Sequence, residues 1–212
     1  KIKIGIFYDK SFGFYYSDDI ETFKEYGVEV ILIDSVKNRS LPKIDALFIG
    51  GGFPETNALV IKKNKNLMKD VREFIEAGKP CYAECGGLMY LSESINYNNK
   101  KHKMVGIIPG NVVMSKKPIG RGYVKLKIKK NHLWGMKHNS IVYAHEFHHA
   151  NLLLNKDSKN HAYNVERGFG INGLSDGFQY KNLLANFSHL RHTKKCPWIK
   201  YFINFIEESK ND

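Results

Sequence analysis

The most constraining feature of this sequence is a short apolar run that ends in a cysteine between small residues. The run Pro80–Ala83 is typical of a buried strand, and Cys85 follows it directly before two glycines and the helical segment Gly87–Ser94. A strand that turns sharply at one residue and continues as a helix is a nucleophile elbow, here with cysteine in place of serine. The small residues leave room for the tight turn. This segment therefore predicts an α/β fold with Cys85 as a candidate nucleophile.

The rest of the chain alternates between strand and helix patterns. Further strands are expected at Lys1–Tyr8, Val28–Ile33, Ala46–Ile49, Tyr123–Lys130, Ser140–Ala144 and Leu183–Phe187. Further helices are expected at Tyr16–Tyr26, Asn66–Ala77 and Trp198–Ser209. Strands separated by helices predict a mostly parallel, doubly wound sheet. The segment Asn96–Lys103 is polar and is expected to be an exposed loop, after which antiparallel strands are added to the sheet.

Composition limits the class of protein. A length of 212 residues with 42% hydrophobic content suits one domain, residues 1–212. No apolar run approaches the roughly 18 to 20 residues that span a membrane. The three cysteines provide no disulfide framework, which favours a reducing, cytoplasmic setting. The formal charge of +12 suits either a well-solvated surface or an acidic partner, but no nucleic-acid-binding motif is present.

Cys85 is the favoured nucleophile for electrostatic as well as geometric reasons. The helix that begins after it directs its positive end at the sulfur, which favours the reactive thiolate. The alternative is a buried structural cysteine, and Cys81, inside the strand, is assigned that role. Glu84 lies next to the nucleophile, but adjacent residues of an elbow point in different directions, so Glu84 is not predicted to be the base.

A second glycine-rich segment, Gly50–Glu55, follows a buried strand. Glycines permit positive φ angles and a close approach of the backbone to a ligand. We expect the N–H groups of Gly51 or Gly52, together with the turn glycines Gly86 and Gly87, to hold the oxyanion of a tetrahedral intermediate there. The alternative is a plain turn.

Acyl transfer from a thiol needs a nearby proton carrier, and histidine is the usual one. Nine histidines are present. Those expected in exposed, polar segments are His102, His132, His138 and His161. Two groups remain open as candidates for the base: His145, His148 and His149 in one segment, and His189 and His192 in another. Spacing alone does not choose between the groups. No carboxylate motif completes a metal site beside the His-x-x-His spacing, so no metal is expected.

Several motifs together resemble one family, the glutaminase domain of the cobyrinic acid a,c-diamide synthases. They are Phe12–Tyr16, Gly50–Glu55, Tyr82–Leu91, Met104–Gly110, Gly120–Tyr123 and His145–His148. The resemblance implies a flavodoxin-like class I glutamine amidotransferase fold with Cys85 as nucleophile. The family's catalytic histidine matches His189, within Ala185–Arg191. His145 and His148 would then lie near the acceptor substrate or pack the antiparallel strands.

Two departures from the family pattern stand out. Arg191 occupies the place where related glutaminases carry a glutamate that orients the catalytic histidine, and arginine cannot accept the imidazole proton. This predicts a Cys–His dyad or an orienting group from elsewhere, and the His-Leu-Arg ending is similar to siroheme-amidating relatives. The family's ATP-dependent synthetase domain is also missing, because no P-loop motif occurs.

The expected function is therefore hydrolysis of glutamine to supply ammonia for ATP-dependent amidation of the a and c carboxylates of a tetrapyrrole of the cobyrinate, sirohydrochlorin or siroheme type. The resemblance implies a synthetase domain or subunit as partner, with ATP and Mg bound there and no cofactor in this chain. A homodimer is also considered. The alternatives are a glutaminase serving another acceptor, such as a cell-wall intermediate, and a catalytically silent docking module.

Overall fold

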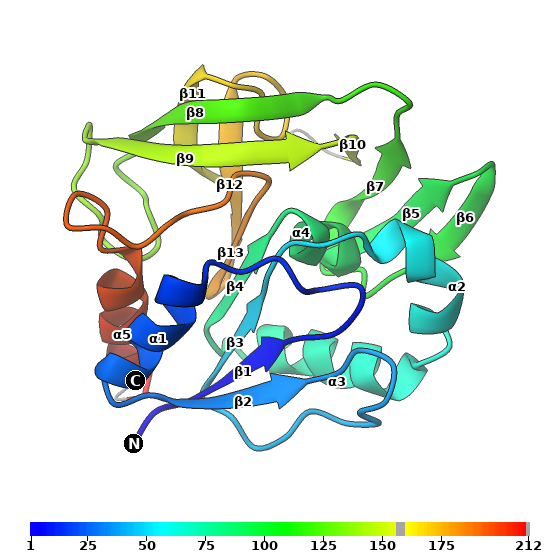
Figure 1. Cartoon of the computed structure of the whole chain (residues 1–212), viewed down its shortest axis with the longest axis horizontal. Coiled ribbons are helices and arrows are strands. Elements are labelled where there is room, and N and C mark those ends of the chain that lie inside the picture. Colours follow the sequence, from blue (N-terminus) through cyan, green and yellow to red (C-terminus); the bar gives the residue numbers. More distant parts are fainter. Residues whose placement is uncertain (156–159, 211–212) are drawn as a thin grey trace.

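The computed structural model describes residues 1–155 and 160–210. Within this part of the chain, nine strands form one large sheet in the order β2-β1-β3-β4-β13-β12-β11-β8-β9 (Figure 1). Their bounds are β1 Lys3–Phe7, β2 Glu29–Ile33, β3 Ala46–Ile49, β4 Cys81–Glu84, β8 Gly120–Ile128, β9 Ile141–His148, β11 His161–Arg167, β12 Ser175–Tyr180 and β13 Leu183–Asn186. The strands from β2 to β13 pair in parallel, and β12, β11, β8 and β9 extend the sheet in antiparallel fashion.

Helices cover both faces of the parallel part (Figure 1). Their bounds are α1 Ser17–Glu25, η1 Pro54–Asn57, α2 Ala58–Ile61, α3 Lys65–Glu76, α4 Gly86–Leu91 and α5 Trp198–Glu208. Helix α3 buries Leu67, Val71 and Ile75, which recur at helical spacing on one face, and it ends where Gly78 adopts a φ of 75°. Helices α3 and α4 share one hydrophobic core, whereas α1 and α5 share the other.

The predicted fold class is confirmed, and most predicted elements agree with the structure to within a few residues. One helix was predicted too long, because Gly87–Ser94 ends as a helix at Leu91 and the chain then enters strand β5, Ser92–Tyr97. The predicted exposed loop Asn96–Lys103 is wrong as well. It forms a hairpin of β5 with β6, Lys100–Lys103, around Asn98 and Asn99. Both asparagines have positive φ, of 49° and 56°, as a tight hairpin turn requires.

The β5–β6 hairpin belongs to a second sheet that the sequence did not reveal. Its order is β10-β7-β5-β6, with β7 spanning Ile108–Met114 and β10 spanning Ala150–Leu154. This sheet packs through Ile95, Ile108 and Val112 against the core that contains α3 and α4. Its small size explains why it was missed, since polar side chains alternate with these apolar ones on short strands.

Three of the four histidines predicted to be exposed are buried. His102, His132 and His161 are at most 5% exposed, and His138 is exposed as predicted. His132 is held inside by a 2.8 Å contact between its Nε2 and the Tyr163 hydroxyl. Polar neighbours in the sequence therefore misled the prediction, because they point outward while the imidazoles point into the core.

The parallel register brings three segments together at one edge of the sheet. Strands β3, β4 and β13 are adjacent, and their carboxyl ends are Ile49, Glu84 and Asn186. The loops that follow these ends therefore meet, and sheets of this kind bind ligands at that edge. Among the described helices, none is both long and apolar enough to cross a membrane.

Candidate active site

The turn between β4 and α4 holds Cys85 in a conformation that L-residues rarely adopt, with φ 45° and ψ −100°. Its N–H donates to the carbonyl of Asn186 on β13 at 2.8 Å, and the N–H of Gly87 donates to the carbonyl of Gly50 at 3.0 Å. These bonds over-determine the turn, as is typical where backbone strain persists at a functional site. The predicted elbow is present, and its sulfur projects from the sheet edge.

His189 lies beside Cys85 because the chain beyond β13 is fixed by a two-way bridge to β9. The N–H of His189 donates to the carbonyl of His145 at 2.7 Å, and the N–H of His145 donates back at 3.2 Å. The imidazole packs edge-on against Phe14 at 4.8 Å between ring centres, next to the Cys85 side chain. Both side chains line one cavity of about 240 Å³. The expected proximity of Cys85 and His189 is therefore observed.

Glu84 supplies the carboxylate that position 191 lacks. Its Oε2 lies 3.4 Å from Nδ1 of His189, and both side chains are at most 5% exposed. The other oxygen, Oε1, accepts hydrogen bonds from the Tyr82 hydroxyl and, at 2.8 Å, from the N–H of Leu190. Nδ1 therefore faces Glu84, which leaves Nε2 of the ring for the sulfur.

Sequence reasoning overlooked this role for Glu84. It correctly placed Glu84 and Cys85 in different directions, but it did not ask what the Glu84 side chain meets. The alternation along β4 was the available signal, since Tyr82 and Glu84 lie two residues apart and share one face of the strand. His189 reaches this face of β4 because β4 pairs with β13, and the local sequence pattern does not reveal that pairing.

The surroundings of His189 favour its protonated form. Burial alone would lower the pKa of His189, but its interactions with the Cys85 side chain and the Glu84 carboxylate outweigh this and raise the pKa to about 10. A histidine held between a thiol and a carboxylate can carry a proton toward the sulfur or away from it. The arrangement is therefore suited to nucleophilic catalysis by cysteine.

Arg191 plays no part in orienting the histidine. Its guanidinium donates to Oδ2 of Asp18 at 2.8 Å and lies over the ring of Tyr16, on the exposed surface. Position 191 therefore leaves His189 free of any contact from its own side chain, and the carboxylate facing the imidazole is that of Glu84. His192 also points away from the sulfur, because its Nδ1 accepts the N–H of Ile199 at the start of α5.

The glycine loop after β3 lies against the nucleophile turn. A Cβ on Gly51 would stand 2.4 Å from Cε1 of His189, and a Cβ on Gly86 would stand 3.0 Å from the nitrogen of Gly52. Because these positions carry no side chain, Gly51 lies against His189 and Gly86 of the nucleophile turn packs on Gly52, which lines the cavity with Cys85. Gly87 differs from the prediction, since its N–H already donates to Gly50 and is not free for an oxyanion.

The three other candidate histidines have separate surroundings, and Nδ1 of His149 lies 3.2 Å from the carbonyl of Ser115. His145 lines the cavity with Cys85 and His189, and its backbone bridges His189. His148 is buried between Oε2 of Glu146, at 3.2 Å from its Nε2, and the carbonyl of Ala150, at 2.8 Å from its Nδ1. Its ring also stacks on Phe187, with 4.1 Å between ring centres. His148 therefore packs the antiparallel part of the fold.

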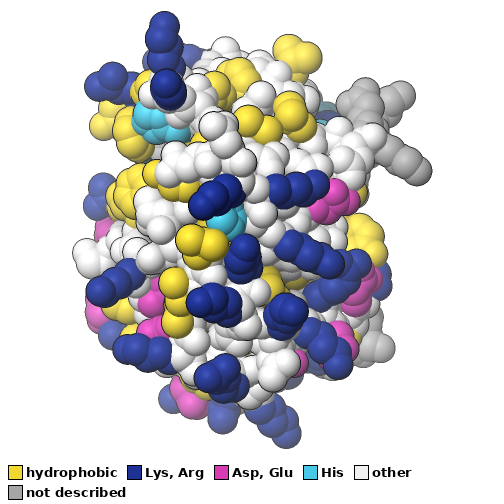
Figure 2. Space-filling model, turned by 90° about the vertical axis from the view of Figure 1, so that its right-hand side faces the viewer, with side chains coloured by type: hydrophobic (Ala, Val, Ile, Leu, Met, Phe, Trp, Pro, Cys, Tyr) yellow, Lys and Arg dark blue, Asp and Glu magenta, His cyan; other side chains and the backbone are white. Residues whose placement is uncertain are grey.

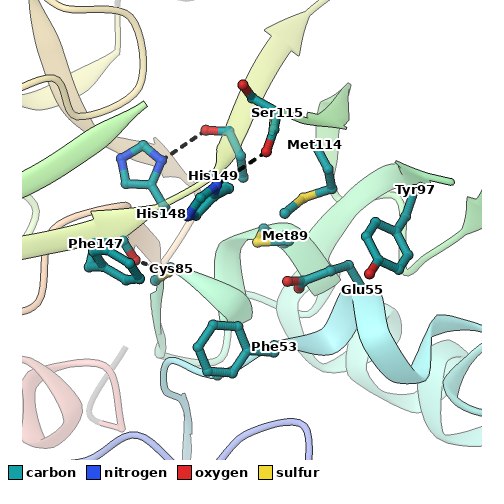
Figure 3. A pocket seen from close by; sticks show the side chains of 12 residues that line it. Phe53, Glu55, Cys85, Met89, Tyr97, Met114, Ser115, Phe147, His148 and His149 are labelled. Carbon is teal, nitrogen blue, oxygen red and sulfur yellow. Dashed lines mark hydrogen bonds between the residues drawn. The ribbon is translucent and has the colours of Figure 1, made fainter. Parts of the chain in front are cut away.

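A second cavity of about 170 Å³ also borders Cys85 (Figure 3). Its described lining combines apolar side chains with a few polar ones: Phe53, Glu55, Met89, Tyr97, Met114, Ser115, Phe147, His148 and His149. The Cys85 thiol lies 3.9 Å from the carbonyl of Phe147 at the boundary between the two cavities. Among residues 1–155 and 160–210, no cluster of three or more His, Cys, Asp or Glu side chains is arranged to hold a metal ion.

The fold is similar to that of solved glutamine amidotransferases. A putative GMP synthase protein from Thermoplasma acidophilum superposes with a TM-score of 0.70 at 18% identity, over 99% of this chain and 96% of that one. The structure of PurLQS from Thermotoga maritima gives a TM-score of 0.68 at 13% identity, over 99% of each chain. At such low identities the likeness concerns the fold alone.

The sequence comparison is more specific. Residues 3–196 match the CobB/CobQ-like glutamine amidotransferase domain, and the chain belongs to that family. It is 38% identical over 209 residues to the cobyrinate a,c-diamide synthase of Archaeoglobus fulgidus, covering 99% of this chain and 45% of that protein. It is 40% identical over 190 residues to the same enzyme of Picrophilus torridus, covering 90% and 40%. The chain thus spans less than half the length of these curated relatives.

Proposed function

We propose that this chain hydrolyses glutamine and supplies the ammonia for an amidation reaction. The observation that carries the proposal is the set of contacts at the elbow: a strained Cys85, the imidazole of His189 beside it and the carboxylate of Glu84 behind the imidazole. A thiol nucleophile with a base that is itself oriented by a third group is the signature of covalent acyl transfer. Membership of the glutamine amidotransferase family makes the glutamine side-chain amide the substrate of choice.

The first half-reaction breaks the amide. The Cys85 thiolate attacks the side-chain amide carbon of glutamine, and the carbonyl oxygen becomes an oxyanion beside the backbone N–H groups of Gly52 and Gly86. The C–N bond then breaks, and His189 gives its Nε2 proton to the leaving nitrogen, which departs as ammonia. Glu84 holds the ring in the tautomer that this transfer needs. The product is a glutamyl thioester on Cys85.

The second half-reaction restores the enzyme. Neutral His189 takes a proton from water, and the resulting hydroxide adds to the thioester carbon. The C–S bond breaks, the Cys85 thiolate leaves next to the reprotonated imidazole, and glutamate is released. Cys85 and His189 are thereby returned to their starting states.

The acceptor that we propose is a tetrapyrrole polycarboxylate of the cobyrinate, sirohydrochlorin or siroheme type, as the names of the relatives suggest. An ATP-dependent synthetase domain or subunit, with its Mg, would activate the acceptor carboxylates, because the chain spans less than half of those relatives. A basic cavity of about 570 Å³ supports an acidic partner. Its described lining includes Lys62, Lys63, Lys65, Lys69, Arg72 and Lys103, on a face rich in Lys and Arg (Figure 2).

Substitution of the nucleophile tests the proposal. We expect Cys85→Ala to abolish release of ammonia from glutamine, whereas Cys81→Ser, four residues earlier and fully buried in β4, should retain it. The measurement is ammonia and glutamate production by the purified protein over time. Glutamine-dependent activity that survived in Cys85→Ala would rule out the mechanism. A wild-type protein silent both alone and with its synthetase partner would instead favour the docking-module alternative.

A further inference from the structure

We propose that the carboxylate of Glu55 binds the α-ammonium group of the substrate, so that the second cavity beside Cys85 selects a free α-amino acid. This inference rests on the proposed glutaminase function and assigns to Glu55 the recognition of the substrate's far end. Figure 3 shows the Glu55 side chain entering the cavity from the side opposite Phe147, with its carboxylate among the lining side chains.

Glu55 is positioned by the segment that packs on the nucleophile turn. It lies in η1, directly after the glycine loop, and the neighbouring Pro54 packs on the nucleophile turn. A Cβ on Gly86 would stand only 3.0 Å from Cδ of Pro54. The Cys85 sulfur and the Glu55 carboxylate therefore face one cavity from two segments that pack on each other. Such a pair can read the two ends of one small ligand.

The Glu55 carboxylate is buried without a partner for one of its oxygens. The residue is 9% exposed, and its Oε2 makes no hydrogen bond within the described structure. Burial raises the pKa of Glu55. A buried carboxylate that lacks a partner costs stability, and such a group is retained where a ligand completes it. The cavity thus contains an unpaired hydrogen-bond acceptor, to which a ligand can donate.

The charges around the cavity suit a zwitterion. Glu55 is the only carboxylate among its described lining residues, and the imidazole of His149 lines the same cavity. The remaining walls are largely apolar, with Met89, Met114 and Phe147 available to contact a short aliphatic chain. Glutamine offers matching chemistry, because its side-chain amide must reach Cys85 while its α-ammonium, three carbons further along, needs an anion.

Equilibrium binding tests this assignment without turnover. Glutamine and glutaramate, which is glutamine without the α-amino group, would be titrated calorimetrically into Cys85→Ala and into Cys85→Ala/Glu55→Gln. A charge-assisted hydrogen bond of this kind is worth roughly tenfold or more in affinity. We expect Glu55→Gln to weaken glutamine binding by at least about tenfold and to leave glutaramate binding within about twofold.

The control is Glu73→Gln in the same background. Glu73 lies on the exposed face of α3, 3.6 Å from Lys69, and should change neither affinity. Equal weakening of both ligands by Glu55→Gln would show a structural role and overturn the assignment. Unchanged glutamine binding, or no binding of glutamine to Cys85→Ala, would overturn it too. Steady-state kinetics of the protein with Cys85 intact provide a second measurement. We expect Glu55→Gln to raise KM for glutamine more than it lowers kcat.

The binding experiment separates this inference from the proposed function. If the wild-type protein releases no ammonia but Glu55 still discriminates glutamine from glutaramate, the glutaminase function fails and the subsite stands. If ammonia is released in a Cys85-dependent way but Glu55→Gln changes nothing, the function stands and the subsite fails.

Discussion

The role of each side chain around His189 depends on its charge. Glu84 and the Cys85 sulfur stand on opposite sides of one buried imidazole, and the carboxylate is itself held by the Leu190 N–H. A buried carboxylate with its own hydrogen bonds stays in place, so the ring it faces keeps one orientation and one tautomer. Glu84 is thus a positioning residue for His189, acting from the position before the nucleophile.

The first residue-scale prediction concerns Glu84→Gln. The amide preserves the shape of the side chain but removes the negative charge, which now helps to raise the pKa of His189. We expect kcat for glutamine hydrolysis to fall by roughly 100-fold, within the range for a proton carrier that has lost its support. The pH profile of kcat/KM should also move, with the ionisation that belongs to His189 appearing at lower pH.

Arg191→Ala is the matched control for this prediction. It removes the surface pair with Asp18, a pair between exposed side chains of the kind that contributes little to stability. Activity and pH profile should match those of the wild type. A fall in kcat for Glu84→Gln without any movement of the profile would show that the carboxylate acts on the fold and not on the histidine.

At the scale of elements, the site depends on how closely α4 approaches the end of β3. A Cβ on Gly87 would stand 2.0 Å from the carbonyl oxygen of Ile49, and backbone atoms cannot yield as a flexible side chain does. The N–H of Gly87 also bonds to Gly50 in the same loop. Gly87 therefore holds the elbow against the glycine loop by its lack of a side chain.

This close approach predicts different outcomes for two glycine substitutions. Gly87→Ala should push α4 away from β3, lower the free energy of unfolding by at least about 2 kcal/mol and abolish glutaminase activity. Gly135→Ala meets no atom within 4 Å and carries only the cost of a φ of 64°, about 1 kcal/mol, with activity retained. Urea unfolding and an ammonia assay measure both effects. Full activity in Gly87→Ala would contradict the packing described here.

Across the whole molecule, two hydrophobic cores lie on the two faces of the large sheet, and several polar groups are buried with them. His132 is one of these groups, next to Trp134 in the core that α1 and α5 share. Burial lowers the pKa of His132 to about 4. The folded molecule thus holds a neutral imidazole where the unfolded chain would bind a proton at mildly acidic pH.

The sign of the resulting pH dependence follows from proton linkage. Because the folded pKa of His132 is depressed, the unfolded chain binds more protons, and stability is lost as pH falls from the unfolded value, about 6.5, toward about 4. Between pH 7 and pH 5 this histidine should cost about 2 kcal/mol. We expect His132→Gln to remove that part of the acid sensitivity in urea unfolding, even if it is less stable at pH 7. His138→Gln, at an exposed position, should keep the wild-type slope.

The sequence by itself determined the parts of this protein that local chemistry dictates. The strand–cysteine–glycine segment predicted the elbow, the apolar periodicity predicted α3 and α5, and the alternation of element types predicted a doubly wound sheet. The motifs also indicated the family and the match of His189. These properties depend on residues that are close in the sequence, and such residues are also close within one helix or strand.

Only the tertiary structure decided which distant groups meet. The pairing of β4 with β13 brings Glu84 to His189, and the packing of η1 on the nucleophile turn leads Glu55 into the cavity beside Cys85. The burial of three histidines and the existence of the second sheet were decided in the same way. The physical reason is that strand order and burial arise from contacts between segments far apart in the chain, and a local pattern carries no record of its eventual neighbours.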